Sequence, residues 1–154
     1  MSNGLDVKKR LLKVERVVGE TTVRRTIEAD VELPFKVIKV FDIIADVNDV
    51  ETELSNGTVE ISGTIEKEIF VVDKGDLVHA VEEAVPFRVM VDVEGAERDM
   101  NVHVDIKVIS VEANFTNAQT IRQTIVLEIF VKVTETKQIE VVVDVSNHDL
   151  DVDK

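Results

Sequence analysis

Cysteine is absent from the 154 residues of this chain, and so are tryptophan and tyrosine. Without cysteine the chain can form no disulfide, no thiolate nucleophile and no thiolate metal site. Aromatic residues make up only 4% of the sequence and the net charge is −13, so neither base stacking nor binding to a phosphate backbone is expected. Two prolines and six glycines are too few for a collagen-like or low-complexity chain.

Long apolar segments are absent as well. The first ten residues contain no apolar run of the kind found in signal peptides, and no run elsewhere is long enough to cross a bilayer. We therefore expect synthesis in the cytoplasm without a signal peptide, and no insertion into a membrane. The length fits one domain that can bury a core.

Valine is the commonest residue, and with the many isoleucines and threonines it gives the composition of a β protein. The clearest pattern lies between residues 56 and 73. Alternate positions there form one largely apolar set, and most positions between them are polar or acidic. The first set is Val59, Ile61, Gly63, Ile65, Lys67, Ile69 and Val71. A period of two predicts a strand with one buried face, and the preceding Asn56-Gly57 predicts a hairpin with a type I′ turn.

Similar alternation elsewhere predicts an all-β fold, an antiparallel β-sandwich of about eight or nine strands. A change of parity within residues 43–54 indicates a β-bulge or a passage between sheets, and the apolar face also switches within residues 100–115. Gly19-Glu20-Thr21 and Pro86 are interpreted as breaks between strands. The secondary structure of residues 5–18 is ambiguous, since their apolar residues fit both a strand and one face of a helix. A strand is favoured because the rest of the chain is β.

Three regions are expected: an N-terminal arm at 1–18, a β-sandwich at 19–146 and an acidic tail at 147–154. The arm carries a basic cluster in an otherwise acidic chain: Lys8, Lys9, Arg10, Lys13 and Arg16. Either this is a solvated edge strand that discourages unwanted pairing, or the arm pairs outside the domain with another subunit. On the second interpretation the candidate assembly interface is Leu5, Val7, Leu12, Val14, Arg16 and Val18.

The order of several motifs resembles a known family. VERVVGE (14–20) precedes a Leu-Pro pair (33–34), then come NGTVEISGTIEKEIFVVD (56–73), VPF (85–87), VDVEGA (91–96) and VLEIFVKV (126–133). This order is similar to the SPOCS domain family, sporulation-associated β domains of Gram-positive spore formers that are often joined to a LysM module. The resemblance implies a non-enzymatic interaction module of spore-envelope assembly. No LysM module follows in this sequence, so peptidoglycan binding is not inferred.

No catalytic, cofactor or metal site is expected. His79, His103 and His148 fall on separate elements, and each is interpreted as a surface residue. Acidic residues cluster in two places, between Asp46 and Glu51 and in the tail at Asp149, Asp151 and Asp153. Both clusters are interpreted as solvated residues and not as a calcium site, because the EF-hand pattern is missing. No serine has a histidine and aspartate partner by motif, and no phosphate-binding loop is present.

The leading hypothesis is a structural, self-assembling subunit of a fibre or coat layer, at the spore surface or outside the cell, that polymerises by β-strand addition of the arm. Such a head-to-tail contact propagates without closing. The alternative is a discrete adaptor that binds a spore-coat morphogenetic protein and does not polymerise. The expected partners are therefore copies of this chain or a coat protein, and no nucleic acid.

Overall fold

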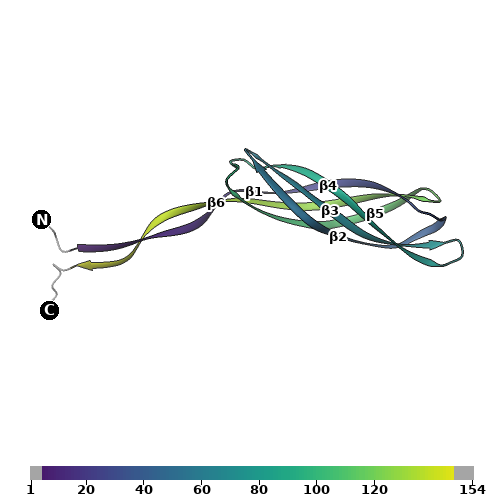
Figure 1. Cartoon of the computed structure of the whole chain (residues 1–154), viewed down its shortest axis with the longest axis horizontal. Helices are drawn as coiled ribbons and strands as arrows, with labels where there is room; N and C mark the ends of the chain where they lie inside the picture. Colours follow the sequence, from purple (N-terminus) through teal and green to yellow (C-terminus); the bar gives the residue numbers. More distant parts are fainter. Residues whose placement is uncertain (1–4, 148–154) are drawn as a thin grey trace.

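The computed structural model describes residues 5–147, and the side-chain surroundings of residues 9–142. The described chain consists of six antiparallel strands joined by turns and loops. They are β1 (Leu5–Glu32), β2 (Val37–Ser55), β3 (Thr58–Asp73), β4 (Val78–Asp92), β5 (Asn101–Asn117) and β6 (Thr120–Asn147). Two three-stranded sheets result, with strand orders β1-β6-β5 and β2-β3-β4 (Figure 1). Among these residues no helix is present that could cross a membrane.

The two sheets pack face to face and share one core, as a β-sandwich does. β3 and β6 are the central strands, and alternate residues of each point to the other sheet. From β3 come Val59, Ile61, Ile65, Ile69 and Val71, all without exposed surface. From β6 come Ile121, Ile125, Leu127, Ile129, Val131 and Val133, which are equally buried. The period-two prediction for the central stretch is therefore confirmed, because its apolar set forms the core.

The all-β prediction with antiparallel sheets is confirmed, but the predicted number of eight or nine strands is wrong. The strands are longer than the sequence pattern indicated, because two apparent breaks lie inside them. At Gly19 the chain makes a register shift against β6 and continues as the same strand. Pro86 lies in the middle of β4. Since β4 is an edge strand, many of its backbone N–H groups face no neighbouring strand, and proline is tolerated there.

The predicted irregularities within strands are confirmed. β2 shifts register against β3 between Asn48 and Glu51, where Asp49 takes a φ of 55°. β5 shifts register against β6 between Val108 and Ser110. The extra residue at such a bulge exchanges the two faces of the strand, and this explains both changes of parity. The first segment of the chain is a strand, as favoured.

The hairpin between β2 and β3 forms as predicted, with Ser55 opposite Thr58. Its turn type differs from the prediction. Gly57 has a φ of 82°, but Asn56 is not among the residues with positive φ, whereas a type I′ turn requires positive φ at both. The neighbouring loop explains how the turn is held. The N–H of Gly57 donates to the carbonyl of Ala96, and the carbonyl of Gly57 accepts from the N–H of Val93.

The turn between β3 and β4 is organised by the side chain of Asp73. Its Oδ1 accepts hydrogen bonds from the backbone N–H groups of Gly75 and Leu77, at 2.8 and 3.0 Å. Its Oδ2 lies 2.7 Å from Nε2 of His79, whose ring stacks on Phe35 with centroids 4.2 Å apart. The hydrogen bonds from His79 and Leu77 hold the pKa of Asp73 below its ordinary value of 3.8.

We expect Ile65→Ala to lower the free energy of unfolding by about 2–5 kcal/mol, because the substitution leaves a cavity in the core. Glu66→Ala, one residue along on the exposed face, should change it by no more than about 0.5 kcal/mol. Urea unfolding followed by far-UV circular dichroism measures both, since the chain has no Trp or Tyr. A larger loss for Glu66→Ala would mean that the faces of β3 are assigned the wrong way round.

A second expectation concerns pH. Because the pKa of Asp73 is lowered in the folded state, its hydrogen bonds stabilise the fold fully above pH 3.8, and this stabilisation is lost as the pH falls through the lowered pKa. The difference in thermal midpoint between the wild-type protein and Asp73→Ala should therefore be largest near neutral pH and should shrink at about pH 2.5. An unchanged difference would show that the carboxylate charge is not what stabilises the turn.

Candidate functional site

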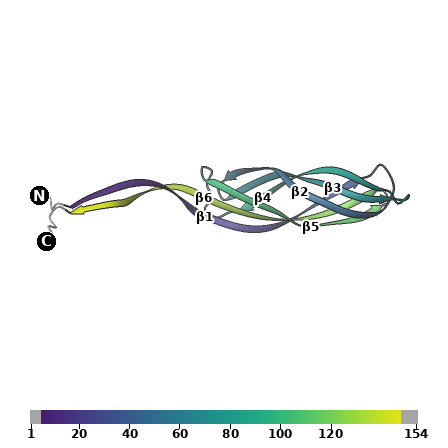
Figure 2. The same cartoon turned by 90° about the horizontal axis from the view of Figure 1, so that it is seen from below.

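The first half of β1 and the last part of β6 leave the two-layer body together and form a two-stranded ribbon (Figures 1 and 2). β5 begins at Asn101, opposite Thr134, so β6 has no second neighbour beyond that residue. The body therefore ends where Val17 pairs with Thr134. We call the paired segments beyond this point, 5–17 and 135–147, the ribbon. Both described ends of the chain lie at its tip.

One face of the ribbon carries a group of four neighbouring aliphatic side chains with charged residues around them, and we call it the aliphatic face. Leu12 of β1 stands directly opposite Ile139 of β6. The next pairs on the same face, one on each side of this pair, are Val14 opposite Lys137 and Arg10 opposite Val141. Successive residues of a strand alternate between faces, so Leu12, Val14, Ile139 and Val141 share a face. Leu12 and Ile139 are 37% and 39% exposed, with no second sheet over them.

The opposite face of the ribbon is more polar, although it too has exposed apolar side chains. Leu11 is 67% exposed and stands opposite Glu140, while Lys9 stands opposite Val142. Charges of opposite sign meet across the two strands. On this face Nζ of Lys9 lies 3.8 Å from Oε1 of Glu140, whereas on the aliphatic face a guanidinium nitrogen of Arg16 lies 2.8 Å from Oε1 of Glu135. These pairs are exposed, so they set the register more than they add stability.

The structure brings together three of the six residues predicted for the assembly interface. Leu12, Val14 and Arg16 lie on the aliphatic face of the ribbon. Val18 lies at the base, packed against the core of the body. Leu5 and Val7 pair with Asn147 and Val145, and their side chains lie outside the described ones. Whether these residues form an interface stays a prediction.

Sequence reasoning missed the second strand of the ribbon. The arm was expected either to be a solvated edge strand or to pair outside the domain with another subunit; in this structure residues 5–17 pair with β6 of the same chain. Two signals were available. The last apolar alternation, from Ile139 onward, extends beyond the body just as the arm does, and its acidic residues complement the basic cluster of the arm.

The outer face of the β2-β3-β4 sheet is acidic. Asp46, Glu66, Glu68 and Glu82 line one shallow groove there. Glu66 accepts a hydrogen bond from Nδ2 of Asn48 at 2.9 Å. Among the described residues no group of three or more histidines, cysteines or carboxylates is arranged to hold a metal ion. The acidic tail and His148 lie outside the described residues.

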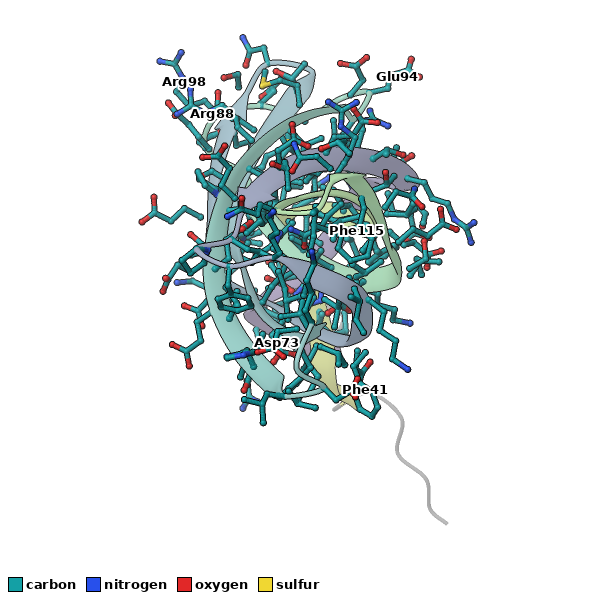
Figure 3. All side chains as sticks on the ribbon, turned by 90° about the vertical axis from the view of Figure 1, so that its right-hand side faces the viewer. Phe41, Asp73, Arg88, Glu94, Arg98 and Phe115 are labelled. Atoms are coloured by element: carbon teal, nitrogen blue, oxygen red, sulfur yellow. The ribbon has the colours of Figure 1, made fainter. Side chains whose placement is uncertain are left out.

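The remaining charged and aromatic side chains that sequence analysis left unplaced are dispersed. His103 is exposed, close to Asp105, and His79 belongs to the turn after β3. Arg122 makes two contacts with the carboxylate of Asp30, at 3.1 and 3.4 Å, which raises the pKa of the guanidinium. At the end of the body away from the ribbon, Phe41 and Phe115 are exposed at separate points (Figure 3).

The comparisons with known proteins agree with the resemblance seen in the sequence. Residues 36–116 match the family model described as SipL, SPOCS domain, which is 81 of the 154 residues. No curated protein and no solved structure matches the chain significantly. The matched segment runs from the start of β2 almost to the end of β5, so it excludes β1 and β6 and with them the ribbon. By this match over more than half of its length, the chain belongs to the SipL SPOCS domain family of sporulation-associated domains.

Proposed function

We propose that this chain is a structural, non-enzymatic subunit that assembles with copies of itself through the ribbon, in a fibre or coat layer at the spore surface. The observation that carries the proposal is the ribbon itself. Two strands extend beyond the body with aliphatic side chains exposed and backbone edges open. Membership of the SPOCS domain family supports the proposed location at the spore surface, and the ribbon supports the proposed mode of assembly.

The ribbon needs a partner for its own stability. An isolated two-stranded ribbon is marginally stable in water, and three strands or a covering layer are normally required. The aliphatic face, with Leu12, Val14, Ile139 and Val141, would gain most from being covered. Burial of one leucine or isoleucine contributes about 1.5–3 kcal/mol, so a few such residues can support association.

The edges of the ribbon are suited to strand addition. Pairing is regular from Lys9 to Val17, without a bulge that would interrupt a row of backbone groups. Most edges of the body are less suitable, since β2 has three register shifts, β5 has two, and β4 contains Pro86. Bulges and prolines are two of the features by which natural sheets prevent unwanted pairing. Both are absent from the described part of the ribbon between Lys9 and Val17.

The acceptor that we propose is the β1 edge of the next subunit between Gly19 and Glu32. This segment pairs with β6 in unbroken register, and β1 has no further neighbour in its sheet. Its exposed end is acidic, with Glu28, Asp30 and Glu32, whereas the donor arm is basic. Charge complementarity of this kind fixes register and direction. Because donor and acceptor surfaces differ, the contact is heterologous and repeats without closing.

Removal of the whole ribbon tests the proposal. A variant with residues 18–134 keeps every residue of both core clusters, so we expect it to fold and to give a β-type circular dichroism spectrum. It should stay at the mass of one chain in size-exclusion chromatography with light scattering, whereas the full chain should form large, concentration-dependent species that negative-stain images show as fibres or sheets. If the truncated chain forms the same assemblies, the ribbon is not the connector.

The full chain alone also distinguishes the alternatives. A full chain that stays monomeric at high concentration would overturn self-assembly and favour the adaptor that binds a coat protein. A full chain that stops at the mass of two subunits would mean that ribbon pairs with ribbon in a closed dimer, and open-ended assembly would be wrong.

A single substitution tests which face of the ribbon is covered. Leu12→Glu places a carboxylate on the aliphatic face and should raise the concentration needed for assembly at least about tenfold, since the lost burial is worth about 1.5–3 kcal/mol. The matched control is Leu11→Glu, the same change one residue away on the opposite face. It should have a smaller effect although Leu11 is the more exposed residue. Equal effects would contradict the assignment of the docking face.

A further inference from the structure

A lysine and a glutamine face each other at the centre of the core. Lys67 belongs to the inner face of β3 and Gln123 to the inner face of β6, so the pair joins the central strands of the two sheets. The side chain of Lys67 has no exposed surface, and Gln123 is completely buried. Lysine is almost never buried in this way without a specific partner. The function proposed above does not use this pair.

The surroundings of the pair are apolar along both strands. Ile65 and Ile69 flank Lys67 on β3, and Ile121 and Ile125 flank Gln123 on β6; all four are without exposed surface. Water is therefore largely excluded, except beside Glu83 of β4, whose side chain is 18% exposed. Glu83 stands directly opposite Lys67 in the register of β3 and β4.

Three polar groups converge in this place. Nζ of Lys67 donates hydrogen bonds to Oε1 of Gln123 and to Oε1 of Glu83, each at 2.8 Å. Nε2 of Gln123 is buried and has no hydrogen-bond partner among the described residues. A buried amide nitrogen without a partner is costly. The amine thus lies beside the carbonyl group of a carboxamide, next to a carboxylate, in a site that excludes water.

From this geometry we infer that Lys67 and Gln123 form an intramolecular isopeptide bond, with Glu83 as the proton carrier. The lone pair of Nζ attacks Cδ of Gln123, the atom to which the hydrogen-bonded Oε1 is attached. A Cδ–Nζ bond forms and the Cδ–Nε2 bond breaks, with its electron pair leaving on Nε2. Two protons leave the Lys67 ammonium, and Glu83 passes them to Nε2, which departs as ammonium. No oxidant, reductant or cofactor is required.

Each feature of the site favours this reaction. The amine and the amide are held in contact, which replaces an encounter in solution by a reaction between fixed groups. Exclusion of water protects the amide carbon from hydrolysis. The nitrogen that leaves is Nε2 of Gln123, which is buried and has no hydrogen-bond partner among the described residues. In the product the single N–H of the new amide can donate to Glu83, so the pair keeps no buried donor without a partner.

The bond would connect the two sheets covalently through their central strands. A cross-link between residues 67 and 123 closes a long loop and restricts the unfolded chain, as a disulfide does in proteins that contain cysteine. This chain has no cysteine. The inference is independent of the ribbon, since the bond would form within a single subunit whether or not subunits assemble.

Mass spectrometry of the purified full chain tests the inference. The intact mass should be lower than the sequence mass by one ammonia. Trypsin should leave Lys67 uncut and should yield a branched peptide, residues 40–74 joined to residues 123–132. Succinimide formation at Asn56-Gly57 also releases ammonia, so the branched peptide and its fragment ions decide the assignment. A wild-type protein at full mass that yields only the separate linear peptides would overturn the inference.

Variants identify the groups involved. Lys67→Met and Gln123→Leu should keep their full masses, while Lys107→Met, which changes an exposed lysine, should still lose one ammonia. Glu83→Gln retains a polar side chain but cannot carry the protons, and bond formation should be slowed at least about tenfold. The same branched peptide at an unchanged rate in Glu83→Gln would show that Glu83 is not the proton carrier. If a variant fails to fold, the wild-type result still decides whether the bond exists.

Discussion

The antiparallel pairing of β1 with β6 is the constraint on which the rest of the structure depends. Within the body, β6 is the central strand of its sheet and provides the apolar face that covers β3. Beyond Thr134 the same pairing continues without a third strand and becomes the ribbon. One pair of strands therefore supplies both half of the core and the candidate assembly surface, and a change in its register would alter both.

The transition from body to ribbon is built into the sequence at Gly19. β1 shifts its register against β6 between Val17 and Gly19, and the loop after β4 packs closely over this point. A Cβ on Gly19 would lie 3.0 Å from a methyl group of Val93 and 3.1 Å from the carbonyl oxygen of Glu94. Glycine thus allows the loop to approach closely, and a larger residue would have to displace it by a few tenths of an ångström. A bulge increases the local twist of the strand, and beyond it the ribbon continues along the long axis of the body (Figures 1 and 2).

The period of two in the sequence was sufficient to predict the fold class, the buried face of β3 and the changes of face within β2 and β5, because alternation reports directly which side chains face a core. It could not predict strand number. Gly19 and Pro86 are breaks in a local pattern, but backbone pairing with a neighbouring strand continues through them. The pairing of the two ends of the chain was also missed, since it joins segments more than a hundred residues apart and alternation within one segment does not identify the strand that pairs with it.

The lysine and glutamine of the core are a second case in which the local sequence pattern could not predict a contact. Lys67 and Gln123 each interrupt an apolar alternation, and the sequence places both on inner faces, but only the packing of the sheets brings them into contact. A polar residue on a buried face indicates a partner without saying which residue it is.

The two inferences meet in β6, which is continuous from Thr120 to Asn147 and so contains both Gln123 and one strand of the ribbon. In a fibre joined through ribbons, tension would enter each subunit along β1 and β6 and would act along the row of hydrogen bonds between them. The β2-β3-β4 sheet shares no strand with that path and is joined to it by side-chain packing. A covalent bond from Lys67 to Gln123 would fix this second sheet to the strand that carries the tension. The sheets could then not slide apart before the β1–β6 pairing itself failed.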